Sequence, residues 1–281
     1  MQIKNKTIKI IIYIVLGLGA VVTILPLIWM LSTSLKANDE VFTNPIQWIP
    51  EEFKFHNYSD VFEVMDFVRY YLNTIIITVV RLAGLFFTAT MAGYAFAKLK
   101  FPGKNILFTC LLATLMVPIY TIMFPAYQMI SEFGMINSYT GLILPQMLGA
   151  FGGAFSIFLI KQGFEAIPTE LSEAARVDGA GVFRTFYQIM LPQIKPVLAS
   201  FFIFSFNSAW NDYVYPLIIV NEDKMKTLSL GLAGFTSMRE GLTNYPLMMA
   251  AAVMTLLPVI ILFVATQKYF IESAVSSGVK G

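Results

Sequence analysis

Residues 173–196 read EAARVDGAGVFRTFYQIMLPQIKP, a polar and charged stretch that lies between long apolar runs. Before it, Thr169 follows the helix breaker Pro168. A hydroxyl at this place can accept a hydrogen bond from the free N–H groups of a first helical turn. Gly179 and Gly181 end the pattern, because glycine readily adopts the backbone conformation that terminates a helix. The stretch therefore predicts a short polar helix capped by Thr169.

The predicted helix has two apolar surfaces close to it in the sequence. Leu171, Ala174 and Ala175 share one helical face, and the small alanines allow another surface to approach closely. A second and bulkier set follows the glycines: Phe183, Phe186, Tyr187 and Ile189. A short helix with such neighbours is typical of a docking surface.

The composition indicates that lipid is the main solvent of this chain. Of its 281 residues, 57% are hydrophobic and 13% are charged, whereas roughly a quarter of an ordinary soluble domain is charged. The net charge of +2 does not favour nucleic-acid binding. Cys110 and His56 are the single cysteine and histidine, so neither an internal disulfide nor a Cys/His metal site is expected.

Six segments have the roughly 20 apolar residues that are needed to cross the hydrocarbon core. They are residues 10–32, 71–97, 105–129, 141–161, 197–220 and 246–268. The first exceeds the length of a signal-peptide core and no clear cleavage site follows it, so it is read as a retained span. We expect an all-α polytopic membrane protein with six transmembrane helices in one domain, residues 1–281. Residues 227–238 are too short to span and are assigned to a loop.

The distribution of Lys and Arg predicts the orientation of these spans. Twelve lie in connections on the side of the two termini and six on the opposite side, with Arg81 inside a span. We therefore expect both termini, the loop 165–196 and the tail 269–281 in the cytoplasm. The opposite loop, residues 36–69, carries prolines and aromatics that favour an ordered irregular cap, although a simple connector is equally compatible.

Several spans contain residues that weaken a helix. Pro118 and Pro125 interrupt the third span, and glycines loosen the fourth at Gly149 and Gly152. Membranes tolerate such residues where neighbouring helices or water satisfy the freed carbonyls. Kinked helices fit a protein that rocks or opens, and they also occur in static bundles.

Two ionisable residues fall within the spans. Arg81 is close enough to the outer end of its helix to extend its guanidinium to the interface, which predicts a structural role. Asp212 belongs to a polar helix face that also contains Ser205, Ser208, Asn211 and Tyr215. Hydroxyl, amide, carboxylate and aromatic groups together suit a neutral sugar. An interhelical contact, a water-lined wall, or a substrate site on a partner subunit are the alternatives.

Motifs for catalysis are missing from the sequence. It contains no GxxxxGK[ST] phosphate loop, no HExxH, no GxSxG and no Cys or His cluster. The spans also lack the series of carboxylates or histidines that is typical of proton relays. We expect no bound cofactor and no ATP hydrolysis by this chain, so an energised partner must drive any transport.

The 173–196 stretch resembles the EAA loop of permease subunits from binding-protein-dependent ABC importers. The matching residues are Glu173, Ala174, Ala175, Asp178, Gly179, Ala180, Phe183, Phe186, Ile189, Leu191, Pro192 and Pro196. NPIQWIP at 44–50, AGYAFAKLKFPGK at 92–104 and WNDYVYPLIIV at 210–220 resemble the carbohydrate branch, which includes the second permease of the maltose importer. The end of the tail also fits, whereas residues 273–275 depart from the pattern.

The resemblance implies a type I ABC importer permease in the bacterial plasma membrane. Its partners would be a homologous second permease, a cytoplasmic ATPase dimer holding ATP and Mg, and an extracellular solute-binding protein that delivers a carbohydrate, in the first place an oligosaccharide. ATPase coupling would fall on Glu173, Ala174, Ala175, Asp178, Gly179, Ala180 and Phe183. Tail contacts with the ATPase would fall on Gly278, Val279, Lys280 and Gly281. The candidate sugar pathway is Ser208, Asn211, Asp212 and Tyr215.

Other functions remain open at this point. An ion-coupled secondary sugar transporter would work as this chain alone, and a membrane scaffold would not transport at all. Within the ABC class, permeases for polyols or glycerol phosphate are similar. The lack of a basic cluster in the spans, apart from Arg81, favours a neutral or mildly charged glycan.

Overall fold

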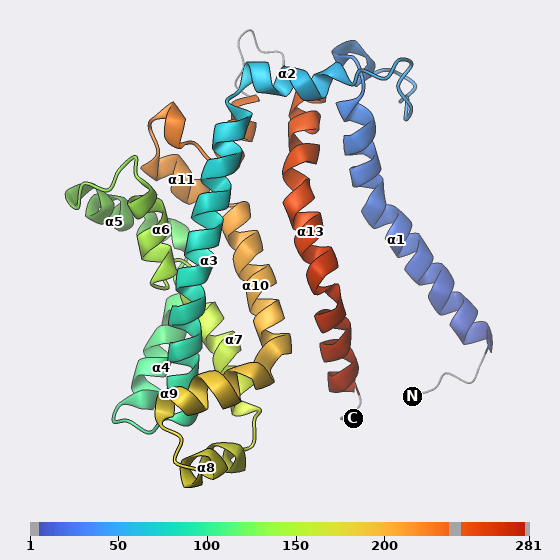
Figure 1. Ribbon diagram of the computed structural model, residues 1–281. Helices are drawn as coiled ribbons and strands as arrows, with labels where there is room; N and C mark the ends of the chain where they lie inside the picture. Colours follow the sequence, from blue (N-terminus) through green and yellow to red (C-terminus); the bar gives the residue numbers. More distant parts are fainter. Residues whose placement is uncertain (1–5, 236–242, 279–281) are drawn as a thin grey trace. The chain divides into compact units, whose positions relative to one another are not determined.

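The computed structural model describes residues 6–235 and 243–278, and within them every regular element is a helix (Figure 1). The chain forms two compact units, one of Met1–Val68 with Gly231–Leu257 and one of Arg69–Leu230 with Pro258–Gly281. The long helices are α1 (Lys6–Ser34), α3 (Phe67–Lys98), α10 (Lys195–Trp210) and α13 (Tyr245–Gly278). An all-helical protein agrees with the predicted fold class.

Shorter helices connect the long ones. They are η1 (Asn38–Glu40), α2 (His56–Val64), α4 (Lys104–Ala113), η2 (Thr114–Met116), α5 (Ile119–Glu132), α6 (Tyr139–Met147), α7 (Gly153–Glu165), α8 (Thr169–Val177), α9 (Val182–Arg184), the π-helix η3 (Thr185–Met190), η4 (Leu191–Ile194), α11 (Val214–Ile219), η5 (Asp223–Met225) and α12 (Leu228–Gly234). Within the connection expected at 227–238, Leu228–Gly234 form the short helix α12, whose Leu228 is buried, and residues 236–238 lie outside the described residues.

The first unit is built from α1, α2 and the beginning of α13. Helix α1 is apolar all round, and its most apolar window has no buried part. Such a surface needs lipid or protein around it. The loop after α1 is ordered and contains α2, so residues 56–58 begin a helix inside the predicted cap. The structure thus supports the cap reading of this loop over the simple connector.

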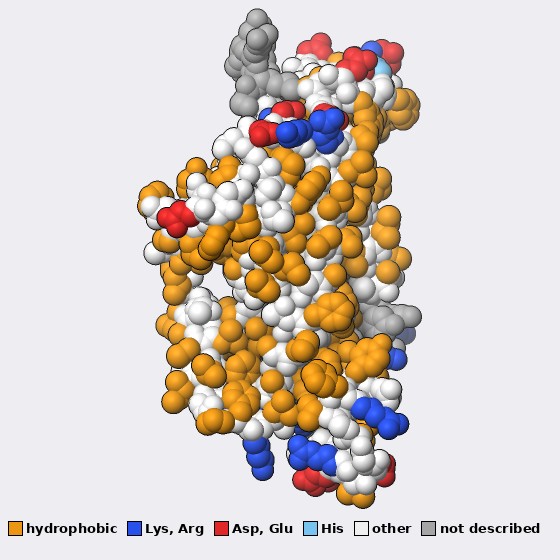
Figure 2. All heavy atoms as spheres, turned by 60° about the vertical axis from the view of Figure 1, so that its left-hand side comes forward, with side chains coloured by type: hydrophobic (Ala, Val, Ile, Leu, Met, Phe, Trp, Pro, Cys, Tyr) orange, Lys and Arg blue, Asp and Glu red, His pale blue; other side chains and the backbone are white. Residues whose placement is uncertain are grey.

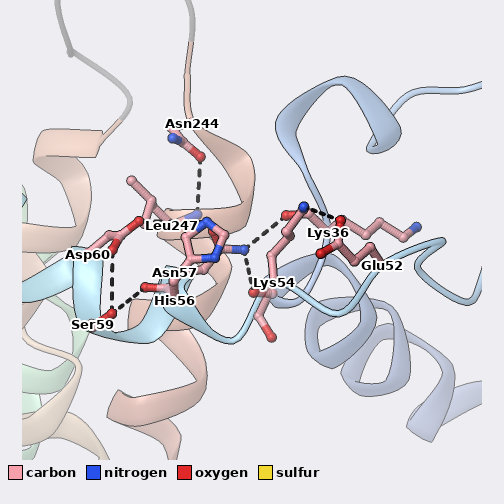
Figure 3. Close-up of polar contacts among 10 residues, drawn as sticks. Lys36, Glu52, Lys54, His56, Asn57, Ser59, Asp60, Asn244 and Leu247 are labelled. Atoms are coloured by element: carbon pink, nitrogen blue, oxygen red, sulfur yellow. Dashed lines mark hydrogen bonds and ion pairs between the residues drawn. The ribbon is translucent and has the colours of Figure 1, made fainter.

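The end of α1 is closed by side chains from that cap (Figure 3). The Asn57 amide donates 2.9 Å hydrogen bonds to the carbonyls of Ser34 and Lys36, which have no partner within the helix. The Lys36 ammonium lies 4.3 Å from the centre of the Trp29 ring and donates to the Gln47 carbonyl. Burial lowers the pKa of Lys36.

The second unit contains broken helices where the sequence predicted kinks. The two parts of the third predicted span, Lys104–Met116 and Ile119–Glu132, meet at an angle of 103° beside Pro118. The fourth is divided into α6 and α7 by a turn in which Gly149 and Gly152 have positive φ. Four helical segments in the described residues are long and apolar enough to cross a membrane, or five with the bent pair. The count of six spans stays a prediction.

Two apolar clusters hold the second unit together. One contains Tyr94, whose ring centre lies 5.4 Å from that of Phe164 and 5.2 Å from that of Phe186. The other surrounds Tyr215, whose hydroxyl donates to the Gly141 carbonyl at 2.6 Å. The first cluster ties α3 and α7 to the π-helix, and the second ties α6 to α11.

Candidate functional site

A buried polar cluster lies in the second unit, among α3, α6 and the end of α10. The Arg81 guanidinium donates to Asp212 Oδ2 at 3.1 Å and to Ser208 Oγ at 3.2 Å. The Gln146 amide donates to the same Asp212 oxygen at 3.2 Å. Arg81 is 5% exposed and Gln146 is 2% exposed. Two donors from distant parts of the chain, Arg81 and Gln146, therefore hold one carboxylate oxygen.

The predicted position of Arg81 was wrong. The sequence favoured a side chain that reaches the interface, yet the guanidinium is buried and paired. A buried charge is costly unless a partner of opposite charge compensates it. Asp212, 131 positions further along the chain, is that partner. Because the pair is so distant in sequence, helical geometry around Arg81 alone could not reveal it.

The polar helix face was also predicted incorrectly. Helix α10 ends at Trp210 and α11 begins at Val214, so residues 205–215 do not form one continuous helix and do not share one helical face. Asn211 turns back to the Asn207 side chain at 2.8 Å. Tyr215 is packed in the apolar cluster at 2% exposure. Of the four candidate pathway residues, Ser208 and Asp212 lie together, while Asn211 and Tyr215 point to other partners.

A cavity of about 150 Å³ adjoins the polar cluster. Its described lining comprises Arg81, Leu85, Gln146, Ala150, Phe151, Gly152, Gly153, Phe155, Ser156, Phe204, Ser205 and Ser208. Sequence reasoning missed Gln146, although a glutamine beside a proline in an apolar span was a usable signal. Its Oε1 atom is buried and has no hydrogen-bond partner among the described residues. Aromatic residues and one residue with an unsatisfied hydrogen-bond acceptor thus border the same space.

The segment that resembles the EAA loop forms α8 and a closing turn. Pro168, and not Thr169, is the N-cap residue, and no side chain caps the helix start. This corrects the predicted cap, because the helix begins one residue earlier and Thr169 is already helical. At the other end Gly179 has φ 75°, and the N–H groups of Gly179 and Ala180 donate to the carbonyls of Arg176 and Ala175. This pair of bonds is a Schellman motif, which requires a left-handed residue at the position of Gly179.

The two apolar surfaces near α8 have different environments. Ala175 is buried at 4% exposure, so the alanine face is partly used within the unit. Phe186 packs against Tyr94, whereas Phe183 and Tyr187 are 76% and 70% exposed. Figure 2 shows charged side chains gathered at the end of the unit that carries α8, below a mostly apolar face.

The remaining coupling residues are accessible. Glu173, Ala174, Asp178 and Gly179 are exposed, and Ala180 is partly exposed. In the predicted tail, Gly278 is the last residue of α13. Val279, Lys280 and Gly281 lie outside the described residues.

A second polar network joins the start of α3 to the loop at 221–227. Asp223 accepts one hydrogen bond from the Tyr70 hydroxyl at 2.8 Å and pairs with Lys226 at 2.7 Å. The bond from Lys226, then the bond from Tyr70, lowers the pKa of the Asp223 carboxyl. The Asn73 amide donates to the carbonyls of Lys224 and Lys226. In the described part of the chain, no group of three or more His, Cys, Asp or Glu residues could hold a metal ion.

Comparison with known proteins gives consistent matches over most of the chain. Residues 84–274 match the family described as binding-protein-dependent transport system inner membrane component. The chain is 34% identical over 281 residues to a melibiose/raffinose/stachyose import permease protein of Bacillus subtilis (strain 168), covering 99% of each. It is 31% identical over 283 residues to an sn-glycerol-3-phosphate transport system permease protein of Pectobacterium atrosepticum, covering 98% of this chain and 99% of the relative.

A solved structure agrees with these relatives. The fold matches a chain in the crystal structure of a bacterial ABC transporter involved in the import of the acidic polysaccharide alginate. The TM-score is 0.80, the identity is 25%, and the match covers 96% of this chain and 99% of the other. The chain therefore belongs to the family of binding-protein-dependent transport system inner membrane components, as a membrane-spanning permease subunit of a bacterial ABC importer and not a catalytic subunit.

Proposed function

We propose that the chain is one of two permease subunits of an ATP-driven importer for a carbohydrate, in the first place an oligosaccharide. The observation that carries this proposal is the buried cluster of Arg81, Asp212 and Gln146 beside a cavity with aromatic walls. Sugars need hydrogen-bond partners for their hydroxyls and an apolar surface for their C–H faces. The saccharides in the names of two similar proteins support the same substrate class.

The partners follow from the family and from the exposed segment around α8. A solute-binding protein would deliver the sugar and a second permease would complete the pore. An ATPase dimer would hold ATP and Mg, while this chain would bind no cofactor. Exposed Phe183 and Tyr187 beside α8 offer apolar surface to the ATPase. ATPase closure would then move α8, and the π-helix at Thr185–Met190 would pass the motion to α10.

The coupling role of α8 can be tested by reversing one exposed charge. Glu173→Lys should weaken co-purification with the ATPase and reduce uptake by about tenfold or more, whereas the stability of the chain changes by less than about 0.5 kcal/mol because Glu173 is exposed. Glu132→Lys, an exposed reversal at the end of α5, is the matched control and should transport normally. Normal uptake and ATPase binding in Glu173→Lys would refute the coupling role.

The substrate class can be tested in cells. A strain that lacks only this chain should lose uptake of a neutral saccharide such as raffinose and regain it with the intact chain. The second candidate is glycerol phosphate, which is favoured by the Pectobacterium relative and by the buried Arg81. Loss of glycerol 3-phosphate uptake with unchanged uptake of all saccharides tested would select this candidate instead.

A further inference from the structure

The cavity beside the polar cluster has a charge balance that bears on the substrate. Among its described lining residues, Arg81 is the one with a formal charge. An isolated buried guanidinium would attract phosphate or carboxylate groups strongly, because attraction between charges rises in a medium of low dielectric constant. Whether the cavity favours anions therefore depends on what else contacts Arg81.

The contacts of Arg81 show that its charge is already matched. Asp212 accepts from Arg81 Nη1 at 3.1 Å, and its side chain is 21% exposed against 6% for the arginine. Asp212 itself is not among the lining residues of the cavity. The carboxylate thus compensates the arginine without lining the cavity, and Ser208 Oγ accepts a hydrogen bond from the other terminal nitrogen, Arg81 Nη2.

The remaining groups in the cavity suit a neutral hydroxylated ring. Gln146 borders the cavity at 2% exposure, its amide nitrogen donates to Asp212, and its Oε1 is buried without a hydrogen-bond partner in the described structure. Ser205 and Ser208 add hydroxyls, and Phe151, Phe155 and Phe204 supply apolar walls. A cavity of about 150 Å³ is large enough for a six-membered ring such as benzene in an engineered protein.

We infer that Asp212 is a specificity-determining residue, which neutralises Arg81 and makes the cavity a subsite for one uncharged sugar ring while it rejects anionic rings. The inference rests on the proposed carbohydrate function and extends it to the charge of the substrate. Asp212 acts as a positioning residue, through Arg81 and Gln146, and does not itself contact the ring.

The test compares two rings that differ in charge. Equilibrium dialysis with radiolabelled glucose and glucuronate would be carried out on the full permease–ATPase complex in nanodiscs, without the solute-binding protein. The intact complex should prefer glucose by about tenfold or more, and Asp212→Asn should raise glucuronate affinity by about tenfold, because the guanidinium loses its compensating charge. The double variant Arg81→Gln with Asp212→Asn should lose that gain. Asp223→Asn, the same change at a residue outside the cavity, should bind as the intact protein does.

The outcomes separate this inference from the proposed function. A preference of the intact complex for glucuronate would overturn the inference. This measurement uses no variant, so the inference can be refuted even if Asp212→Asn folds poorly. Unchanged glucuronate affinity in a folded Asp212→Asn complex would also overturn it. Binding of neither ring to a complex that still imports a saccharide would reject the subsite and leave the carbohydrate function intact. Failure of saccharide import in the cell test would instead reject the proposed function.

Discussion

The buried cluster around Arg81 and the exposed segment around α8 differ in how their side chains are matched to their surroundings. In the cluster, polar groups placed among apolar helices find their partners within the chain: Arg81, Asp212, Ser208 and Gln146 contact one another. Around α8, apolar groups such as Phe183 and Tyr187 remain exposed beside charged residues. The charges of the first region are compensated within this chain, whereas the second leaves apolar surface exposed for the ATPase contact proposed above.

This difference predicts where each region is sensitive to mutation. Changes in the cluster should alter folding and substrate choice, because its partners are internal and buried charges are costly to leave alone. Changes around α8 should leave the chain folded and alter its cooperation with the ATPase. Four substitutions, taken from the largest expected effect to the smallest, test this contrast.

Removing one member of the buried pair should give the largest loss of stability. Arg81→Leu leaves the Asp212 carboxylate without its cation and should destabilise the chain by about 3 kcal/mol. Arg81→Leu with Asp212→Leu should be clearly more stable than the single variant. Denaturant unfolding in detergent measures both. A single variant that is as stable as the double variant would show that the two charges are not coupled.

Close packing beside the cluster should be sensitive to one added methyl group. A Cβ atom at Gly84 would lie 2.5 Å from the Met147 Cβ, so Gly84→Ala forces α3 and α6 apart. We expect a loss of about 1–3 kcal/mol. Gly17→Ala in α1, where nothing lies within 4 Å of the added atom, is the control for thermal unfolding. Equal melting temperatures for the two variants would contradict the close approach.

The turn after α8 should show a smaller effect on stability and a distinct effect on transport. Gly179 has φ 75° and nothing within 4 Å of an added Cβ, so Gly179→Ala introduces backbone strain of about 1 kcal/mol and no steric clash. Gly181→Ala has equal space and a φ of −68°, and should be nearly neutral. Reduced uptake by Gly179→Ala with normal uptake by Gly181→Ala would show that transport requires the left-handed turn at Gly179. Equal uptake by the two variants would show that it does not.

The smallest effect concerns Asp223 and pH. Hydrogen bonds from Lys226 and Tyr70 lower its pKa below the ordinary value of 3.8. The contribution of the ionised form is therefore present above that value and disappears as the pH falls through the lower folded-state pKa. Because the side chain is 67% exposed, the contribution is small. When the pH is lowered from about 6 to about 3, the melting temperature should fall slightly more for the intact chain than for Asp223→Asn. An identical shift would show that these bonds add nothing.

The sequence predicted some features because they depend on neighbouring residues. Apolar length indicated the long helices α1, α3 and α13, and Gly179 indicated the end of α8, since both follow from local backbone and solvent requirements. It failed where distant segments meet. The pairing of Arg81 with Asp212 joins parts of the chain 131 residues apart, and Gln146 contacts Asp212 from helix α6.

The break after Trp210 was missed for a related reason. A helical wheel assumes one continuous helix, yet α10 ends there and Tyr215 turns to the Gly141 carbonyl in α6. That hydrogen bond depends on tertiary packing, which periodicity does not contain. The family resemblance supplied the functional class, and the structure supplied the partners of individual side chains.

The most direct test of the central claim is ATP-dependent sugar uptake by reconstituted protein. Proteoliposomes would contain this chain with its second permease, its ATPase subunits and its solute-binding protein, and a parallel set would contain this chain alone with an ion gradient. We predict that the complete set imports a saccharide only when ATP is supplied to the ATPase side, and that the chain alone imports none. Uptake by the chain alone under an ion gradient, independent of ATP, would contradict the account.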